Sequence, residues 1–271
     1  MHVRTYGQAG PPVVVLHGGP GAPGHMAPVA RALADAFRVY EPFQRGSGGV
    51  PLRVADHVAD LRELVESLGA GARPALIGSS WGAMLALAFA AAHPDLPGPL
   101  VLIGCGTFDR MARARMEKIL DERTAPRLRQ RLERLAGEIP EADRRLMVRA
   151  RLVLPLYSCD LVTRDLESEA CDARAHEETW ADMLRLQDEG AYPAAFSAIR
   201  SPVLMLHGAE DPHPGRLIRT SLERYIPHLE YREWECCGHY PWLERAVRDE
   251  FFTVLRGWLK HAAAPHDTIE R

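Results

Sequence analysis

Short apolar, β-branched runs alternate with longer amphipathic segments along most of this chain of 271 residues. A buried strand, a helical crossover and another buried strand are typical of a parallel sheet covered by helices. The predicted strands are residues 13–16, 37–43, 74–78, 99–104, 201–208 and 229–236. The predicted helices are residues 25–36, 54–68, 81–92, 215–226 and 241–261. We therefore expect an α/β fold with a mostly parallel sheet flanked by helices.

One segment interrupts the alternation of strands and helices. Residues 107–197 are rich in Arg, Glu and Leu at helical spacing and contain almost no strand signal. Its arginines are interleaved with acidic residues, which favours solvated helix faces over a basic binding surface. The sequence thus predicts a core made of residues 1–106 and 198–262, a helical cap inserted at 107–197, and a flexible tail at 263–271.

The charge balance bears on which partners are expected. The chain has 33 basic and 36 acidic side chains, a net charge of −3, which gives no general attraction to nucleic acid or to an anionic membrane. A small molecule is therefore the expected partner. The charged start "MHVRTYGQAG" lacks the apolar region of a secretory signal, and no apolar run is long enough to span a membrane. We expect a cytoplasmic protein.

The cysteine pattern bears on metals and redox chemistry. The five cysteines are odd in number and have no C-x-x-C spacing, which argues against a disulfide framework or a zinc site. We expect neither a metal nor a cofactor. The adjacent pair Cys236 and Cys237 is open to two interpretations, a redox pair or two small buried side chains that end a strand.

The stretch "IGSSWGAM" at residues 77–84 places Ser80 between Gly78 and Gly82. A G-x-S-x-G pattern at a strand-to-helix junction is typical of an elbow that exposes a nucleophilic serine. The run before it reads as a strand and the alanine-rich run after it reads as a helix. We interpret Ser80 as the nucleophile, the alternative being a small residue in a tight turn.

Attack by a serine on a carbonyl carbon needs N–H donors for the oxyanion that forms. The amide of Trp81, at the start of the predicted helix, supplies the first donor. The second is expected in the glycine-rich loop "LHGGPG" at residues 16–21, where we choose Gly19. His17 in the same loop is interpreted as a brace for the loop.

A serine nucleophile also needs a base, and the base needs an acid to orient it. In this architecture the chain order is Ser, then Asp or Glu, then His. Asp211 follows a predicted strand in "LMLHGAEDPH", and His239 follows the last predicted strand in "CCGHYPWLE". Both are therefore expected at the carboxyl edge of the sheet. Asp109 and Glu210 remain alternative acids.

Three local motifs together resemble the α/β-hydrolase superfamily, and more narrowly its proline iminopeptidase-like branch. They are "HGGPG" at 17–21, "QRGSG" at 44–48 and "GSSWGAMLALAFAAAHP" at 78–94. The resemblance implies an α/β-hydrolase fold with a helical cap over the active site. It also implies the catalytic roles of Ser80, Asp211 and His239, in agreement with the assignment from spacing.

The chain departs from that branch in three places. Phe43 stands where its loop usually has an aspartate, and the short N-terminus leaves room for at most one of the two usual leading strands. The Trp- and Glu-rich cap motif that holds a substrate's amino group is not recognisable. The nearest stretch, "HEETWADM", offers three candidate substrate-binding residues, Glu177, Glu178 and Trp180. Apolar candidates for the pocket wall are Leu152, Leu154, Leu156, Tyr157 and Trp180.

Three functions are compatible with these observations. The leading one is a serine hydrolase that cleaves a small-molecule ester or amide through an acyl-enzyme. The second is an aminopeptidase of the proline iminopeptidase type. The third, a hydrolase fold kept as a non-catalytic receptor, is disfavoured because all three catalytic residue types are present.

Overall fold

The computed structural model describes residues 1–262, and the tail predicted at 263–271 lies outside the described residues. Seven strands of the described chain form one sheet in the order β1-β3-β2-β4-β5-β6-β7. Their bounds are β1 Val3–Tyr6, β2 Pro12–Leu16, β3 Arg38–Pro42, β4 Ala75–Ser79, β5 Leu100–Ile103, β6 Val203–Gly208 and β7 Leu229–Trp234. β1 pairs antiparallel with β3, and the other neighbours pair in parallel. The predicted α/β fold is confirmed.

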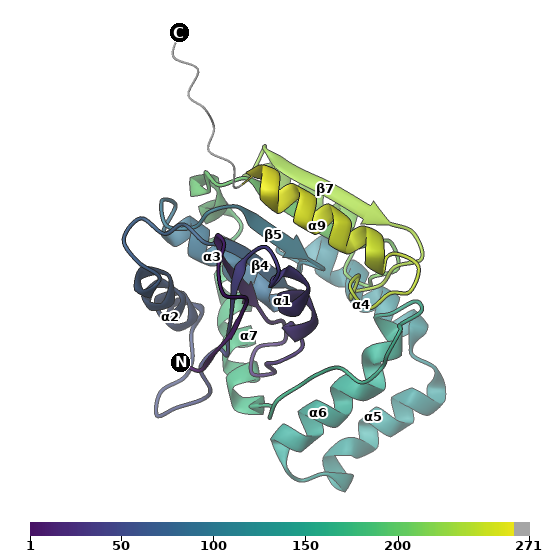
Figure 1. Cartoon of the computed structure of the whole chain (residues 1–271). Helices are drawn as coiled ribbons and strands as arrows, with labels where there is room; N and C mark the ends of the chain where they lie inside the picture. Colours follow the sequence, from purple (N-terminus) through teal and green to yellow (C-terminus); the bar gives the residue numbers. More distant parts are fainter. Residues whose placement is uncertain (263–271) are drawn as a thin grey trace.

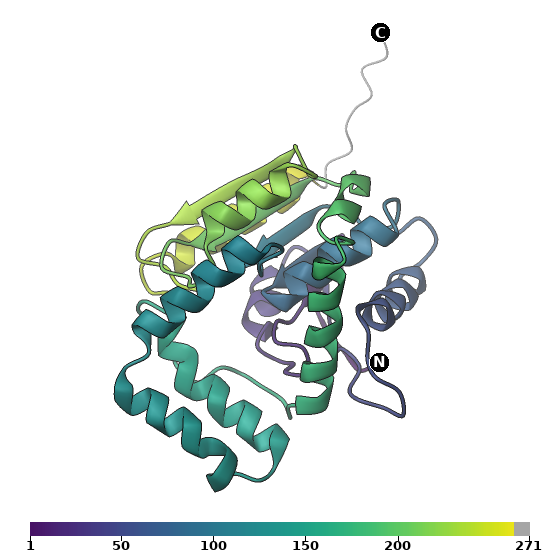
Figure 2. The same ribbon diagram turned by 180° about the vertical axis from the view of Figure 1, so that it is seen from behind.

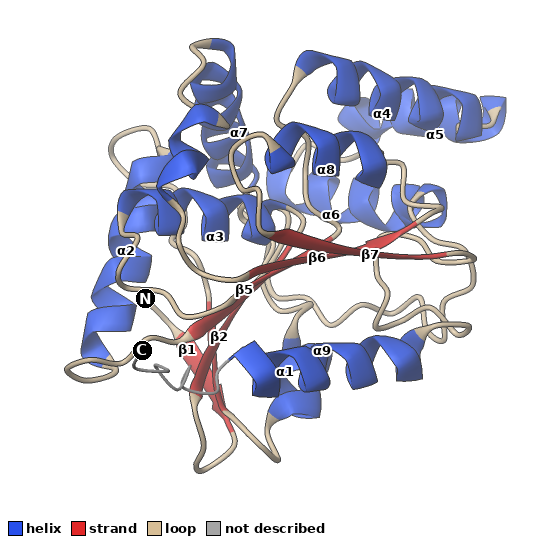
Figure 3. Cartoon of the chain, turned by 90° about the horizontal axis from the view of Figure 1, so that it is seen from above, coloured by secondary structure: helices blue, strands red, loops and turns tan. Residues whose placement is uncertain are grey.

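Helices cover both faces of the sheet (Figure 3). One face packs against α2 (Val54–Ser67), α3 (Trp81–Ala92) and α8 (Gly215–Glu223), and the other against α1 (Ala27–Leu33) and α9 (Arg248–Ala262). The central strands β4 and β5 are buried on both faces, which is why they read as continuous apolar runs. Within the edge strand β7, exposed residues instead alternate with partly buried ones.

One predicted helix is shorter than expected. Helix α9 begins at Arg248, whereas the sequence predicted a helix from residue 241. Residues 241–247 form turns that bury Trp242 in the core and turn the carboxylate of Glu244 towards backbone N–H groups. The apolar spacing of this segment comes from side chains that turns bury one by one. The predicted helix is therefore wrong for residues 241–247.

The segment between β5 and β6 is helical. Its elements are α4 (Arg110–Arg123), α5 (Pro126–Glu138), α6 (Ala142–Val153), η1 (Leu154–Leu156), α7 (Ala173–Asp188) and η2 (Ala194–Ala198). Helices α5 and α6 lie side by side and extend away from the sheet, whereas α7 returns along the core (Figures 1 and 2). The segment thus leaves the sheet at the carboxyl edge, which carries Ser80, and α7 leads the chain back to the opposite edge, where β6 begins.

Helix α7 is fastened to two loops of the core. Asp172 accepts hydrogen bonds from the Ser47 N–H and hydroxyl, at 2.7 and 2.9 Å. The carboxylates of Glu178 and Asp182 accept N–H groups of Leu52 and Val54, each at 2.8 Å. The Asp172 N–H donates to the Gly21 carbonyl at 2.8 Å, and His176 Nδ1 lies 2.9 Å from the Pro20 carbonyl. The loops at 17–21 and 44–54 are therefore held partly by α7.

The five cysteines are free thiols. Cys237 is buried, but Cys236 is exposed, so the interpretation of the pair as two buried side chains holds for Cys237 alone. The left-handed backbone of Cys236, with φ of 53°, turns its side chain outward at the end of β7. Of the described helices, none is both long and apolar enough to cross a membrane.

Candidate active site

Ser80 occupies a sharp turn between β4 and α3. Its φ of 53° and ψ of −117° lie in a region that an L-residue adopts only when its surroundings impose it. The Ser80 N–H donates to the Ile103 carbonyl at 2.8 Å, which fixes the turn to the neighbouring strand. A Cβ at Gly78 would collide with the backbone of Gly82, and one at Gly82 with the end of β2. The flanking glycines are therefore required for the turn to form.

His239 and Asp211 meet behind this turn. His239 Nδ1 lies 2.6 Å from Asp211 Oδ2, and since a carboxylate only accepts, the Nδ1–H donates. Asp211 follows β6 and His239 follows β7, so both lie at the carboxyl edge of the sheet. The His239 N–H donates to the Tyr157 carbonyl at 2.7 Å. The ring of His239 is thus oriented by a buried carboxylate from one side.

Asp211 is surrounded by three histidines. Its Oδ1 accepts the His213 N–H at 2.9 Å and lies 3.0 Å from His213 Nδ1, while His207 Nε2 lies 3.4 Å from Oδ2. The ring of His213 stacks on that of His239, with centroids 4.8 Å apart. Burial alone would raise the pKa of Asp211, but His239, His213 and His207 outweigh burial and hold that pKa well below its ordinary value. Asp211 is therefore an ionised carboxylate that can accept hydrogen bonds from the imidazoles of His239 and His213.

The two alternative acids lie elsewhere. Asp109 caps helix α4 by accepting the Ala112 N–H at 2.8 Å. Glu210 pairs with Arg123 at 3.3 Å and is exposed. Within the described chain, neither carboxylate contacts His239, so Asp211 is the acid that the fold brings to the histidine.

Of the two predicted oxyanion donors, Gly19 lines the same cavity as Ser80, and Trp81 directly follows Ser80 in the chain. Gly19 lies in the loop after β2 with φ of 52°, and Trp81 is the first residue of α3. In the described chain no hydrogen-bond acceptor takes the Gly19 N–H, and the first N–H groups of a helix have no partner within it. The N–H of Gly18, by contrast, donates to His25 Nε2 at 3.2 Å. Of the two adjacent glycine N–H groups, it is that of Gly19 that remains free for a ligand.

Gln44, from the "QRGSG" stretch, joins the two donor segments. Its N–H donates to His17 Nε2 at 3.2 Å, and its side-chain amide donates to the His17 carbonyl at 3.1 Å. Its Oε1 accepts the indole N–H of the buried Trp81 at 2.7 Å. His17 therefore braces its loop, as the sequence predicted, and Gln44 holds that loop in register with the start of α3.

A cavity of about 300 Å³ opens at this edge of the sheet. Its wall includes Ser80 and His239 together with side chains of the segment between β5 and β6. Of the predicted apolar lining residues, Leu154, Tyr157 and Trp180 line it, whereas Leu152 and Leu156 do not. Ser80 Oγ makes no hydrogen bond to His239 within the described chain, as is common before a substrate aligns the two groups.

The three predicted substrate-binding residues are not brought together. Trp180 faces the cavity and lies edge-on to Trp81, with ring centroids 6.1 Å apart. Glu178 is two residues away on the same helix, about 200° around it. Its carboxylate is occupied by the Leu52 N–H and by Arg174, at 2.8 and 2.7 Å. Glu177 is exposed and does not line the cavity. Helical geometry thus turns Glu178 away from the cavity, and Glu177 is exposed to solvent instead.

Two further residues position the site and carry no sequence motif. Gly104, at the end of β5, has φ of 53°, and a Cβ there would lie 2.8 Å from His239 Nδ1. Glu244 is fully buried and accepts the N–H groups of Cys159, Asp160 and Gly238 at 2.7 to 3.0 Å. It ties the His239 loop to the segment that follows η1. Neither residue stood out from the sequence, because each acts on a partner far away in the chain.

Asp211, His213 and His239 also offer three potential metal ligands within 4.8 Å of one another. Both Asp211 oxygens already accept N–H groups of these histidines. A metal between the rings would have to displace the bond from His239 Nδ1–H to Asp211, so the arrangement is suited to hydrogen bonding.

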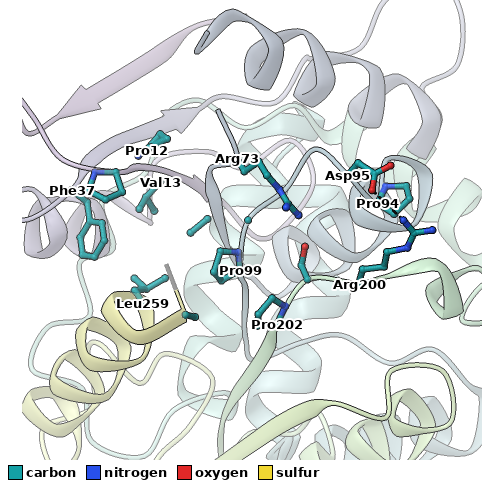
Figure 4. Close-up of a pocket in the computed structure, with 15 residues that line it drawn as sticks. Pro12, Val13, Phe37, Arg73, Pro94, Asp95, Pro99, Arg200, Pro202 and Leu259 are labelled. Atoms are coloured by element: carbon teal, nitrogen blue, oxygen red, sulfur yellow. Dashed lines mark hydrogen bonds and ion pairs between the residues drawn. The ribbon is translucent and has the colours of Figure 1, made fainter. Parts of the chain in front are cut away.

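A second, larger hollow of about 570 Å³ lies at the opposite edge of the sheet (Figure 4). It is walled by the first residues of the parallel strands, among them Pro12, Val13 and Pro99. Two of its charged residues, Arg200 and Asp95, pair with each other at 3.2 Å. Its position at the amino ends of the strands separates it from Ser80 and His239.

Three histidines, of which His17 and His57 are buried and His25 is half-buried, make the stability of the fold sensitive to acid. Burial lowers the pKa of His17 and His57 to about 4 and that of His25 to about 3. The unfolded chain therefore takes up protons below about pH 6.5 that the folded chain does not. We expect the free energy of unfolding to fall from about pH 6.5 to about pH 4, by up to about 1.4 kcal/mol per histidine per pH unit.

Urea unfolding at a series of pH values measures this slope. His25→Gln removes one such group and should flatten the pH dependence. The exposed His261→Gln is the control and should leave it unchanged. An unfolding free energy that rises towards pH 4 would contradict the expectation.

Comparisons with known proteins bear on the whole chain. The family described as "Alpha/beta hydrolase family" matches residues 13–250. A proline iminopeptidase from Neisseria gonorrhoeae is 41% identical over 104 residues, which is 35% of this chain and 33% of that relative. The match thus spans about a third of that relative's length. A proline iminopeptidase from Lactobacillus helveticus is 26% identical over 286 residues, 92% of this chain and 90% of the relative.

Solved structures share the fold. A thermophilic esterase from Thermogutta terrifontis superimposes with a TM-score of 0.65 at 21% identity, covering 97% of this chain and 94% of that one. At this level of sequence identity, the similarity concerns the arrangement of strands and helices alone.

Proposed function

This chain is a hydrolase that belongs to the alpha/beta hydrolase family, and on that premise we propose that it cleaves small-molecule esters or amides with Ser80 as nucleophile. His239 is the general base and Asp211 orients it. The observation that carries the proposal is that Ser80 and His239 wall one cavity while the ring of His239 is bonded to Asp211.

The proposed reaction has two halves. In the first, Ser80 Oγ attacks the carbonyl carbon while its proton passes to His239 Nε2. The bond to the leaving group breaks as His239 returns that proton to the departing oxygen or nitrogen, and the acyl group stays on Ser80. In the second half, water gives a proton to His239 and attacks the acyl carbon. The acid leaves and Ser80 regains its proton.

The oxyanion formed in each half needs donors that are already in place. The N–H groups of Gly19 and Trp81 are proposed for that role, each worth roughly 3 to 4 kcal/mol in the transition state. The bonds of Gln44 to His17 and to the Trp81 indole support it, because they fix the two donor segments relative to each other. Such fixed donors need no reorganisation when negative charge develops.

A proline iminopeptidase activity is the second candidate, favoured by the similarity to proline iminopeptidases over 92% of the chain. A substrate with a free amino group would need a carboxylate near Ser80. Among the described residues that line the cavity, none is Asp or Glu. Glu178, the sequence-based candidate, is occupied by the Leu52 N–H and Arg174. We therefore favour acyl esters and neutral amides over aminoacyl substrates.

A hydrolysis panel with purified protein tests this choice. We expect p-nitrophenyl acyl esters to be turned over with a kcat/KM at least about tenfold above that of prolyl p-nitroanilide, the equivalent of about 1.4 kcal/mol. Glu177→Gln and Glu178→Gln should keep ester hydrolysis within a few-fold of wild type. Faster cleavage of the prolyl amide, lost when either glutamate is replaced, would establish the iminopeptidase alternative.

A further inference from the structure

The wall of the Ser80 cavity carries charge of one sign. Its described lining residues include two arginines, Arg151 and Arg164, and no Asp or Glu. The half-buried His25, which also lines it, is neutral near pH 7, since its partial burial lowers its pKa to about 3. Both arginines are exposed, so they lie on the solvent side of the cavity. A substrate that enters meets two guanidinium groups and no fixed negative charge.

The side chains of these two arginines are not tied up in contacts that hold the described fold together. Arg151 lies in the last turn of α6, and Arg164 lies in the loop between η1 and α7. Within residues 1–262, neither forms an ion pair or a side-chain hydrogen bond. The loop acids Glu167 and Glu169 pair instead with Arg31 and Arg4 of the core. The two glutamates of the loop thus pair with the core, and Arg164 stays unpaired beside the cavity.

The nearest acid on α6 is also committed. Asp143 accepts the N–H of Ala173 at 2.8 Å, where it supports the start of α7. It makes no ion pair with Arg151 in the described structure. The guanidinium of Arg151 therefore keeps its donor fork free for an acceptor that enters the cavity.

Much of the remaining wall is apolar, formed in part by Met147, Val153, Leu154, Leu166 and Trp180. A cavity of about 300 Å³ is at the small end of the range for ligand sites. A mainly apolar cavity with guanidinium groups on its solvent side fits a short acyl compound with an anionic end. Arginine binds carboxylates through two parallel N–H groups, and it repels a free ammonium group.

Resting on the proposed hydrolase function, we propose that the substrates carry a carboxylate and that Arg151 and Arg164 bind it. The carboxylate selects the substrate, while Ser80 cleaves an ester or amide bond deeper in the cavity. The two arginines act on binding and stay remote from the reacting atoms. Replacing them should therefore raise KM for the anionic substrate and leave kcat nearly unchanged.

A matched pair of chromogenic esters tests the proposal. The p-nitrophenyl half-ester of adipate and p-nitrophenyl hexanoate have the same chain length and leaving group, and differ in the terminal carboxylate. In a second pair, carboxyphenyl hexanoate and phenyl hexanoate, the carboxylate is placed on the leaving group. We expect wild type to prefer the anionic member of one pair by about tenfold in kcat/KM, and Arg151→Gln and Arg164→Gln each to reduce that preference by roughly three- to tenfold.

Arg149→Gln is the matched control, because it removes the same charge from α6 about 200° around the helix, and Arg149 borders a separate hollow with α4 and α5. It should leave the preference unchanged. High salt should weaken the preference in wild type, since both arginines are exposed. Turnover of the neutral esters without any preference, or a preference that survives the double variant, would overturn the inference alone. No turnover of any ester would contradict the proposed function as well.

Discussion

Ser80→Ala should abolish ester hydrolysis and labelling by a fluorophosphonate probe, with kcat falling by roughly 10⁴- to 10⁶-fold. The hydroxyl of Ser80 is the proposed attacking group, and its strained backbone presents it to the cavity that His239 also lines. Alanine keeps the backbone and removes only the oxygen, so binding should persist. Gel fluorescence after probe treatment and steady-state rates on p-nitrophenyl hexanoate measure the two effects.

The chain supplies its own matched control in the neighbouring serine. Ser79 is fully buried at the end of β4, and its hydroxyl has no hydrogen-bond partner in the described chain. Ser79→Ala should therefore keep both labelling and activity within a few-fold of wild type. Full labelling of Ser80→Ala, or loss of labelling in Ser79→Ala, would place the nucleophile elsewhere.

Asp211→Asn should lower kcat by roughly 10³- to 10⁴-fold while the fold is retained. The surroundings of Asp211 decide which way the new amide points. The oxygen at the Oδ1 position is held by the His213 N–H, so the NH₂ group takes the Oδ2 position, which faced His239 at 2.6 Å. His239 must then accept at Nδ1 and carry its proton on Nε2. In that tautomer it cannot take the proton of Ser80.

Asp109→Asn is the control for this substitution. Asp109 caps α4, and asparagine caps helices about as well, so both stability and kcat should stay close to wild type. Far-UV circular dichroism and thermal unfolding of both variants separate a catalytic effect from a folding one. If Asp109→Asn were the inactive variant and Asp211→Asn the active one, the acid would follow β5 instead of β6.

The fold was predictable because its strongest signals are local. The strands β2, β4, β5 and β6 read as apolar runs, since both of their faces are covered by helices. The sequence also allowed for at most one leading strand, and β1 is that strand. The helix expected from residue 241 was wrong because periodicity does not distinguish a helix from turns that bury Trp242 and Glu244.

The proximity of Ser80, Asp211 and His239 followed from a rule of topology, that loops after parallel strands gather at one edge of the sheet. The residues that shape the cavity follow no such rule. Glu178 was chosen because its stretch is the nearest to a Trp- and Glu-rich cap motif, yet the direction in which it points depends on how α7 packs against residue 52. Arg151 and Arg164 were two among many charged residues of a helical segment, and only the folded chain distinguishes them by their place at the cavity.

The bonds between α7 and the core limit how this architecture can be recombined. Five backbone groups of the core loops are held by α7 residues, namely the N–H groups of residues 47, 52 and 54 and the carbonyls of residues 20 and 21. A chimera that exchanges residues 107–170 keeps these bonds and can inherit a new binding pocket. An exchange that extends through residue 182 replaces the side chains that make four of these five bonds and loosens the loop that carries Gly19. Substrate range can therefore diverge through α4 to α6, while α7 has to be inherited together with the core.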